Sequence, residues 1–368
     1  MKKVAAYFSI IFGIIVLVVS SSYFFMDRIS AVREAAPWGV WWGPHQVSDI
    51  GDLTRMGYLE NIPKFRDTGG YIYIKQDKGN PKIDLYLYGD SYVKDFPDSV
   101  YYGLNSFHFA RRDHNDLIYN LDTGKTNILV IEIAERFART FFNTPDGIYE
   151  HVRKDNGVTY DRKFVPNILS APVSYAGFTF PRIDMLFMMA VNQNIEYNLF
   201  TYNFLNRFRT FKPTMNYYLF NRGSGDVVIS DDGTFLFIRE SVNNYKYSSS
   251  YAPVAETEVS YSVSVFNEIY EHYRNEGFDE VYLSIIPNPA TIVQPEYYNG
   301  FIPDLQNPVR GYPLKMQVID VHSPFIYSDN PRQYFKRGDT HWNAKGAQVW
   351  IDRVNEQLRK WDTASVSR

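Results

Sequence analysis

The sequence IDLYLYGDS at residues 83–91 sets the expected fold. Apolar and more polar side chains alternate from Ile83 to Leu87, which is the period of a β-strand. Gly89 then allows a tight turn of the backbone, and Ser91 follows two residues later. In open α/β sheets, ligands bind in the crevice outside the carboxyl ends of the strands. These residues therefore predict a strand that delivers a serine to a binding crevice.

Strands and helices alternate along the chain on the carboxyl side of this strand. Continuous apolar runs predict buried strands, and apolar residues at helical spacing predict helices. Strands are expected at residues 128–133, 281–286 and 317–321, and helices at 258–276, which stops at Gly277, and at 344–360. Such an order indicates an α/β fold, a three-layer sandwich with a mainly parallel sheet.

Residues 140–250 interrupt this alternation for too long to be a simple connection. We expect an inserted subdomain there that covers one side of the sheet. Strands at 227–229 and 235–238 flank Asp231-Asp232-Gly233, a strong hairpin signal. The segment 185–205 is rich in Met, Phe, Tyr and Asn, which either packs the core of the subdomain or forms a docking surface for a glycan or a membrane partner.

The composition excludes several classes of protein. The chain has 368 residues, 45% of them hydrophobic, which is ample for a packed core. It has no cysteine, so it has neither a disulfide scaffold nor a thiolate metal site nor a cysteine nucleophile. Its net charge is −3 and it lacks a basic block, which argues against a nucleic-acid partner.

The N-terminal residues carry the pattern of a membrane anchor. Lys2 and Lys3 precede an uncharged, mostly apolar run at residues 4–26, which as a helix would span about 34 Å against about 30 Å of hydrocarbon. We expect one retained span, with the main domain outside the cytoplasm. A cleaved signal peptide is the alternative, because small residues follow the apolar run.

The domain organisation follows from these patterns. We expect an anchor at residues 1–28, an irregular linker at 29–80, a catalytic domain at 81–360 that includes the insertion, and a tail at 361–368.

A second segment with catalytic chemistry, GDTHWN at residues 338–343, precedes the last predicted helix. Asp339 and His341 are two residues apart in an extended stretch, so both side chains point to the same side. Asp339 could then orient the ring of His341, and His341 could take the proton of the Ser91 hydroxyl. Alternatively, Asp339 or Asn343 only caps the helix, and Gly-Asp-Ser is only a turn.

With these two segments the chain resembles the SGNH superfamily, and within it the acetyltransferase-like branch of polysaccharide O-acetylation, to which the alginate-acetylating proteins belong. Gly89-Asp90-Ser91 and Asp339-Thr340-His341-Trp342 carry the resemblance. It implies an SGNH-like catalytic domain in which Ser91, His341 and Asp339 are catalytic and Asp90 and Trp342 support the two motifs. The Gly-x-Asn-Asp block of SGNH hydrolases is missing, and the order of the two motifs is that of ordinary SGNH hydrolases.

The oxyanion donors are less well marked in the sequence. An oxyanion needs hydrogen-bond donors placed at the developing charge. The Ser91 amide, Gly89 and the side chains of Arg136 and Asn288 are the candidates, and a structural ion pair between Glu135 and Arg136 is the alternative for that arginine.

The leading hypothesis is therefore O-acyl transfer, most simply of acetyl, to an extracytoplasmic polysaccharide through an acyl-serine. The resemblance implies a multi-span membrane acyltransferase as partner and a bacterial inner-membrane, periplasmic location. We expect no cofactor and no metal; His108, Asp113, His114 and Asp116 match no strong ligand signature. A carbohydrate acetylesterase with the same triad, or a non-catalytic assembly or glycan-binding subunit, are the alternatives.

Overall fold

The computed structural model describes residues 2–21, 50–67, 73–76, 82–112, 114–141, 146–155, 174–175, 178–179, 203–307 and 313–364. The chain forms two compact units. The smaller consists of residues 1–48 and 163–220, and the larger consists of residues 49–162 and 221–368. All residues predicted for the site lie in the larger unit.

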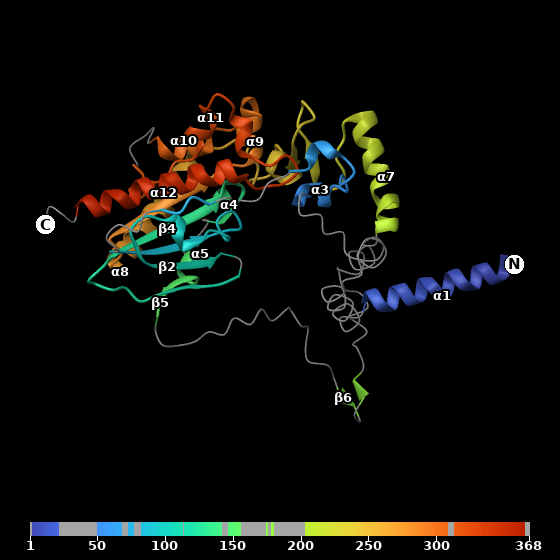
Figure 1. Cartoon of the computed structure of the whole chain (residues 1–368), viewed down its shortest axis with the longest axis horizontal. Coiled ribbons are helices and arrows are strands. Elements are labelled where there is room, and N and C mark those ends of the chain that lie inside the picture. Colours follow the sequence, from blue (N-terminus) through green and yellow to red (C-terminus); the bar gives the residue numbers. More distant parts are fainter. Residues whose placement is uncertain are drawn as a thin grey trace. The chain divides into compact units, whose positions relative to one another are not determined.

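A five-stranded sheet forms the centre of the larger unit (Figure 1). Its strands are β1 (Ile83–Gly89), β2 (Leu104–Arg111), β4 (Thr126–Ala134), β10 (Glu280–Ile286) and β11 (Gln317–Val318). They lie in the order β11-β10-β4-β1-β2, and every neighbouring pair is parallel. The predicted α/β fold with a mainly parallel sheet is confirmed.

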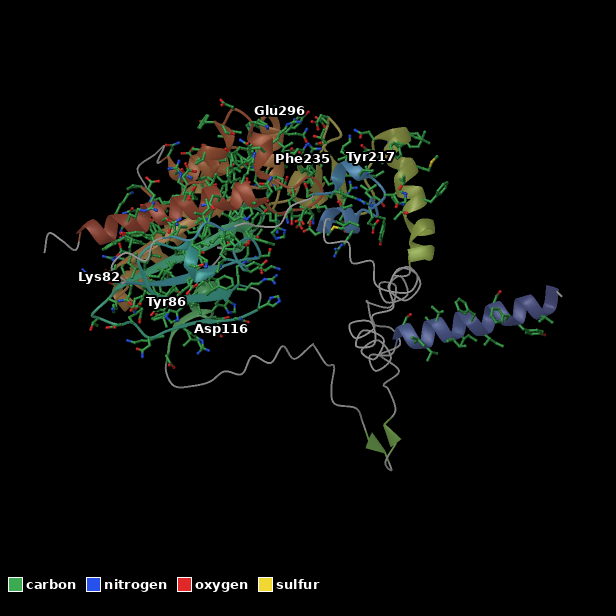
Figure 2. The ribbon with its side chains drawn as sticks, viewed as in Figure 1. Lys82, Tyr86, Asp116, Tyr217, Phe235 and Glu296 are labelled. Atoms are coloured by element: carbon green, nitrogen blue, oxygen red, sulfur yellow. The ribbon has the colours of Figure 1, made fainter. Side chains whose placement is uncertain are left out.

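Helices cover both faces of this sheet. The residues of β1 are all buried, as expected for a parallel strand between two helical layers. Leu87 belongs to the apolar core that includes α12 (Ala344–Ala364), whereas Tyr86 belongs to the core that includes α8 (Glu256–Glu276). Successive side chains of a strand point to opposite faces, so the architecture is consistent with a three-layer sandwich. Figure 2 shows these side chains, Tyr86 among them, filling the space around the sheet.

Shorter elements connect the strands of the larger unit and cover their ends. The short helices are α3 (Asp52–Met56), α4 (Glu135–Phe141), α5 (Asp146–Tyr149), α9 (Pro289–Val293), α10 (Phe301–Gln306) and α11 (His322–Ile326). Single 3-10 turns lie at 63–65, 98–100, 239–242, 295–297 and 331–334. The short strands are β3 (Leu117–Tyr119), which pairs with β5 (Val152–Lys154), and β8 (Val227–Ile229), which pairs with β9 (Leu236–Ile238).

The two long helices of this unit end or begin where the sequence predicts. Helix α8 stops before Gly277, whose φ of 109° is in the left-handed region that favours glycine after a helix. Helix α12 begins after Asn343, whose side-chain oxygen accepts the N–H groups of Lys345 at 2.9 Å and Gly346 at 3.3 Å. Asn343 is therefore the cap of this helix, which leaves Asp339 for another role.

Two strands differ from the prediction. The predicted strand at 317–321 is shorter, because only Gln317 and Val318 pair with β10. Strand β2 was not predicted from the sequence. It lies at the edge of the sheet and is mostly half-buried, so polar residues such as Asn105 and Ser106 interrupt its apolar pattern.

The stretch 140–250 divides between the two units. Residues 163–220 belong to the smaller unit, whereas β5, β8 and β9 belong to the larger one. The predicted hairpin is confirmed, since β8 and β9 pair in antiparallel fashion, and the neighbouring Phe235 enters the core with α12. Of the aromatic segment 185–205, residues 185–202 lie outside the described residues.

The smaller unit contains α1 (Lys2–Ser21), α7 (Asn203–Phe220) and a short pair, β6 (Ser174–Tyr175) with β7 (Phe178–Thr179). Residues 22–26 of the predicted anchor lie outside the described residues. The anchor at residues 4–26 stays a prediction from the sequence. Among the residues that the structure describes, no helix combines the length and the apolar character needed to cross a bilayer.

Candidate active site

Ser91 lies just beyond the carboxyl end of β1, at the point where the strand order of the sheet reverses. Numbered along the chain, the strands lie in the order 2-1-3-4-5, with β1 beside β4. In doubly wound sheets this reversal opens a crevice at the carboxyl ends of the two strands, and ligands bind there. The topology therefore places Ser91 where such folds carry their sites.

Gly89 is required at the end of β1 by a close approach of neighbouring side chains. A Cβ atom at this position would lie 2.6 Å from Cγ2 of Val93 and 2.7 Å from Oε2 of Glu132. Both distances are far below van der Waals contact. Gly89 thus shapes the turn before Ser91, which is a structural role and differs from the oxyanion role considered for it.

Asp90 fixes the turn that carries the serine. Its buried carboxylate accepts the N–H of Tyr92 at 2.9 Å and the N–H of Ala134, at the end of β4, at 3.0 Å. Its own N–H donates to Oε2 of Glu132 at 2.7 Å. Burial and the nearby Asp90 charge raise the pKa of Glu132 well above its usual range. These bonds join the end of β1 to the adjacent strand β4. They also fix Asp90 and Tyr92, the residues on either side of Ser91.

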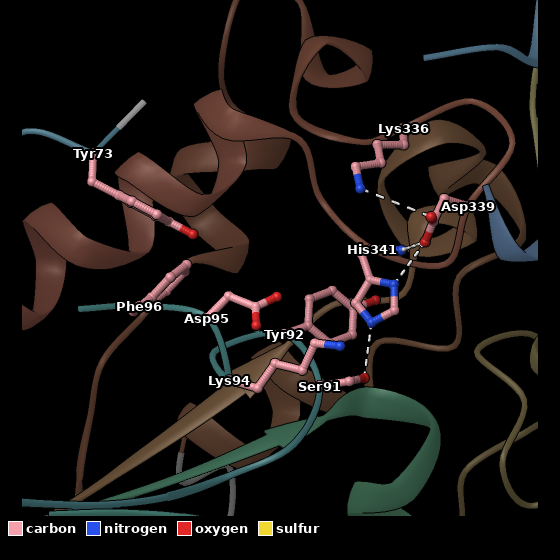
Figure 3. A pocket seen from close by; sticks show the side chains of 9 residues that line it. All are labelled: Tyr73, Ser91, Tyr92, Lys94, Asp95, Phe96, Lys336, Asp339 and His341. Atoms are coloured by element: carbon pink, nitrogen blue, oxygen red, sulfur yellow. Dashed lines mark hydrogen bonds and ion pairs between the residues drawn. The ribbon is translucent and has the colours of Figure 1, made fainter. Parts of the chain in front are cut away.

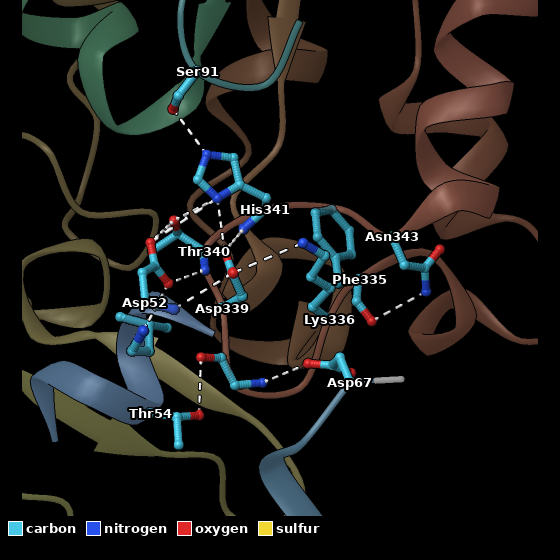
Figure 4. Close-up of polar contacts among 12 residues, drawn as sticks. Asp52, Thr54, Asp67, Ser91, Phe335, Lys336, Asp339, Thr340, His341 and Asn343 are labelled. Carbon is cyan, nitrogen blue, oxygen red and sulfur yellow. Dashed lines mark hydrogen bonds and ion pairs between the residues drawn. The ribbon is translucent and has the colours of Figure 1, made fainter. Parts of the chain in front are cut away.

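His341 reaches Ser91 from a hairpin-like loop before α12 (Figure 4). Phe335 and Trp342 form an antiparallel bridge at the base of this loop, and Trp342 is fully buried. Nε2 of His341 lies 2.8 Å from Oγ of Ser91. Two segments that are 250 residues apart in sequence thus come into hydrogen-bond contact.

Asp339 holds the other side of the ring. Its Oδ1 lies 2.6 Å from Nδ1 of His341 and also accepts the backbone N–H of His341 at 3.0 Å. Burial alone would raise the pKa of Asp339, but the hydrogen bond and the charge of His341, together with Lys336, hold that pKa below its usual range. Lys336 Nζ is 3.8 Å from Asp339 Oδ2. The carboxylate is therefore kept ionised, as an acceptor for the Nδ1 proton.

The segment 50–67, which the sequence assigns to an irregular linker, packs against this loop. The N–H and hydroxyl of Thr54 both donate to the carbonyl of Gly338, at 2.9 and 3.1 Å. Asp67 accepts the N–H groups of Arg337 at 3.1 Å and Gly338 at 3.2 Å. No sequence signal pointed to these contacts, because they join positions more than 250 residues apart.

Asp52, in the same segment, approaches His341 itself. Its two carboxylate oxygens accept the N–H of Thr340 at 2.8 Å and the hydroxyl of Thr340 at 2.6 Å. Its Oδ2 lies 4.0 Å from Nδ1 of His341. Sequence reasoning missed Asp52, and it named Thr340 only as part of the motif at residues 339–342 without a role.

The group of Asp52, Asp339 and His341 invites comparison with a metal site, because their ligand atoms lie within 4.8 Å of one another. Both nitrogens of His341 already face protein partners, Ser91 and Asp339. A ring that donates its Nδ1 proton to a carboxylate has no lone pair there for a metal. We therefore interpret the group as a hydrogen-bonded network of protein side chains.

A pocket of about 200 Å³ opens beside Ser91 (Figure 3). Figure 3 shows Ser91 and His341 on one side of it and the rings of Tyr73 and Phe96 on the other. Its lining is mixed, with Tyr73, Ser91, Tyr92, Lys94, Asp95, Phe96, Lys336, Asp339 and His341. Ser91 and His341 thus face a cavity that a small molecule could enter.

Arg136 lies close to this site, beside Tyr92. Its guanidinium is 4.8 Å from the ring centre of Phe137 and 5.9 Å from that of Tyr92, whose ring is 4.8 Å from that of His341. Arg136 does not line the pocket. Although burial acts in the opposite direction, the neighbouring Tyr92 and Asp90 raise the pKa of Arg136. Tyr92 also donates its hydroxyl to the carbonyl of Thr340, so it supports the histidine loop.

Asn288 belongs to a separate buried network at the end of β10. Its N–H donates to Oε2 of Glu135 at 2.8 Å, and its side-chain amide donates to Oγ of Ser250 at 2.8 Å. Thr291 donates to the same Glu135 oxygen at 2.6 Å. Burial raises the pKa of Glu135 to about 7, although these hydrogen bonds lower it. The described contacts of Asn288 therefore belong to this network around Glu135. None of them reaches Ser91 or His341.

Comparisons of the chain with protein-family models, with curated proteins and with solved structures find no match.

Proposed function

We propose that this protein is a serine-dependent O-acyltransferase with an SGNH-like catalytic domain, and that Ser91, His341 and Asp339 are its nucleophile, base and orienting acid. One observation carries the proposal: an unbroken hydrogen-bonded row from Ser91 Oγ through the ring of His341 to Asp339, with distances of 2.8 and 2.6 Å. A hydroxyl is a weak nucleophile until a base in hydrogen-bond contact can take its proton.

The chemistry follows from these contacts. As Ser91 Oγ attacks the acyl carbonyl, its proton moves to Nε2 of His341, and the ring becomes positively charged. Asp339 stabilises that charge across the Nδ1–H bond. His341 then gives the proton to the departing group, which leaves an acyl ester on Ser91. An acceptor hydroxyl then loses its proton to His341 and attacks the ester; the bond to Ser91 Oγ breaks, and His341 returns the proton to that oxygen.

Among the residues that the structure describes, the Ser91 N–H is the backbone donor that suits an oxyanion at this serine. The amides on either side of it are occupied, since Asp90 N–H donates to Glu132 and Tyr92 N–H donates to Asp90. Within the described part of the chain, the Ser91 N–H itself makes no hydrogen bond. A backbone donor beside the attacking oxygen suits the charge that develops on the carbonyl.

The pocket supports a small acyl group as the transferred unit. A water molecule occupies about 30 Å³ of liquid, so a cavity of about 200 Å³ has room for an acetyl ester but cannot enclose a polysaccharide chain. The acceptor would therefore bind at the mouth of the pocket. Transfer to an extracytoplasmic polysaccharide, with a multi-span membrane acyltransferase as donor at the bacterial inner membrane, rests on the resemblance of the two motifs and on the apolar residues 4–26.

An acetylesterase is the second candidate, because 23% of the His341 side chain is exposed and water could reach an acyl-serine there. Transfer and hydrolysis share the same acyl-enzyme and differ only in the group that resolves it.

The test uses Ser91→Ala, with Ser99→Ala as the matched control, because Ser99 does not line the pocket. Purified protein is incubated with a chromogenic acetyl ester and analysed by mass spectrometry for acetyl on residue 91. We expect acetylation in the wild type and in Ser99→Ala, and none in Ser91→Ala. An acetyl mass gain on an added oligosaccharide supports transfer, and release of free acetate alone supports the esterase. Equal ester turnover in wild type and Ser91→Ala would rule out both.

A further inference from the structure

We propose that Asp52 is a positioning residue for His341: it fixes Thr340 and adds a second negative charge beside the ring. This inference rests on the proposed function, because it assumes that His341 is the base. Asp52 lies in the segment 50–67, and Thr340 follows it by 288 residues. The proposed role of Asp52 goes beyond the triad, and Asp52 lies in a segment that the sequence pattern assigns to a linker outside the catalytic domain.

The contacts with Thr340 hold the attachment point of the catalytic ring. Both polar hydrogens of Thr340 donate to Asp52, the N–H at 2.8 Å and the hydroxyl at 2.6 Å. Thr340 is buried and immediately precedes His341. Its hydroxyl oxygen also lies 3.3 Å from Nδ1 of His341. Because one carboxylate engages both donors, rotation of the backbone before His341 is restrained.

The charge of Asp52 acts on the same nitrogen that faces Asp339. Oδ2 of Asp52 is 4.0 Å from Nδ1 of His341, against 2.6 Å for Oδ1 of Asp339. When the ring takes the serine proton, it becomes positive with two carboxylates close to its Nδ1. At 4 Å an ion pair remains significant even near the protein surface, although water screens Asp52, whose side chain is 42% exposed.

The surroundings of Asp52 raise its pKa overall, so they disfavour its charged form. Burial and the charge of Asp339 raise its pKa, and the hydrogen bonds from Thr340 and the charge of His341 lower it. The titratable and charged groups that face it directly or through these partners are Asp339, His341, Lys336, Tyr92 and Arg136, together with Asp67, whose charge reaches Asp339 and Lys336. Two neighbouring carboxylates repel each other, and a positive charge close to both relieves that repulsion. The protonated ring of His341 supplies such a charge during catalysis.

Asp67 provides the matched control. It binds the same loop from the same segment, through the N–H groups of Arg337 and Gly338. It makes none of the contacts with Thr340 that Asp52 makes. If the segment only anchors the loop, substitutions at Asp52 and Asp67 should have the same consequences.

The test compares Asp52→Asn with Asp67→Asn in the full chain. The asparagine side chain introduced in Asp52→Asn keeps an oxygen to accept the Thr340 N–H but carries no charge. Two quantities are measured across pH 5 to 9: the rate at which a fluorophosphonate probe labels Ser91, and the NMR titration of the His341 ring, assigned with His341→Gln. Circular dichroism checks that each variant is folded.

We expect Asp52→Asn to move the acidic midpoints of both profiles to lower pH by about 0.5 to 1 pH unit and to lower the maximal labelling rate about threefold to tenfold. Asp67→Asn should leave both midpoints in place, and Asp52→Glu should restore the wild-type midpoint in part. Unchanged midpoints in a folded Asp52→Asn protein would overturn the inference, and so would an equal shift in Asp67→Asn.

The two proposals fail separately in this experiment. If the probe does not label wild-type Ser91 but the His341 titration moves in Asp52→Asn, the acyl-transfer proposal fails and the positioning role stands. If labelling depends on Ser91 and His341 but neither profile moves, the positioning role fails and the acyl-transfer proposal stands.

Discussion

His341 is held at both ring nitrogens and at its own backbone N–H, and these contacts bring three ordinary side chains into one hydrogen-bonded row. Nε2 faces Ser91, whereas Nδ1 and the backbone N–H share one oxygen of Asp339. A ring restrained in this way can accept a proton only at Nε2, where Ser91 lies. The chemistry proposed for the protein thus depends on how the ring is oriented as much as on which residues are present.

Glu135 is a second single residue that gives a prediction, in this case on stability. Its pKa of about 7, against an ordinary value of 4.5, means that the folded state binds this proton more tightly than the unfolded state does. The free energy of unfolding should therefore fall as pH rises from about 4.5 to about 7, by about 3 kcal/mol in total, and stay level above that.

Glu135→Gln tests this, because glutamine still offers an oxygen to Asn288 and Thr291 but carries no charge at any pH. Urea unfolding of both proteins from pH 5 to 8 should show that the variant gains stability relative to wild type as pH rises. A constant difference between the two proteins across this range would contradict the assignment of a buried, neutral carboxyl to Glu135.

Among the elements, two turns form the site, one after β1 and one before α12. The first turn is bonded to the neighbouring strand by Asp90, and the second is closed by the bridge between Phe335 and Trp342. Trp342 packs against Tyr92, with ring centres 5.1 Å apart, so the two turns share one apolar wall. Each turn is held by contacts outside itself.

Gly89→Ala tests the first turn. A Cβ atom there would collide with Val93 and with Glu132, so the end of β1 must shift. We expect a loss of about 1–3 kcal/mol of stability and a labelling rate of Ser91 that falls well beyond what partial unfolding explains. Gly124→Ala is the control, because that glycine lies in an exposed turn with its nearest contact at 3.2 Å, from a flexible Asp122 side chain. Equal, small effects of the two substitutions would show that the turn tolerates a Cβ.

The larger unit as a whole extends further towards the N-terminus than the predicted catalytic domain. Residues 50–67 pack into it with buried side chains such as Leu53 and Phe65. Glycine is needed where this segment crosses the histidine loop, because a Cβ on Gly338 would lie 2.1 Å from Oγ1 of Thr54. The segment is thus part of the body that holds the site.

Truncation tests this for the molecule as a whole. A chain that begins at residue 49 keeps every described contact with the histidine loop, whereas one that begins at residue 82 lacks Asp52, Thr54 and Asp67. We expect the first to be labelled at Ser91 like the full chain and the second to lose labelling and part of its thermal stability. Comparable labelling of both chains would show that residues 50–67 are dispensable.

Local patterns in the sequence were enough to predict the central strands, the two long helices, the hairpin and the pair of motifs that hold Ser91 and His341. These features depend on periodicity and on turn chemistry, which a chain displays within about 10 to 20 residues. Strand β2 escaped prediction, because an edge strand need not be continuously apolar. Asn288 was a plausible donor by its position after β10, and the structure instead places it in a network with Glu135 and Ser250.

The contacts between distant segments could be established only in the folded chain. Folding brings Ser91 and His341 together across 250 residues, and Asp52 and Thr340 across 288. Hydrogen bonds of this kind leave no periodic trace in a sequence, because either partner is an ordinary polar residue in its own neighbourhood. The sequence also left open whether Asp339 caps a helix or contacts a histidine, and in the folded chain Asn343 caps α12 while Asp339 bonds to the ring of His341.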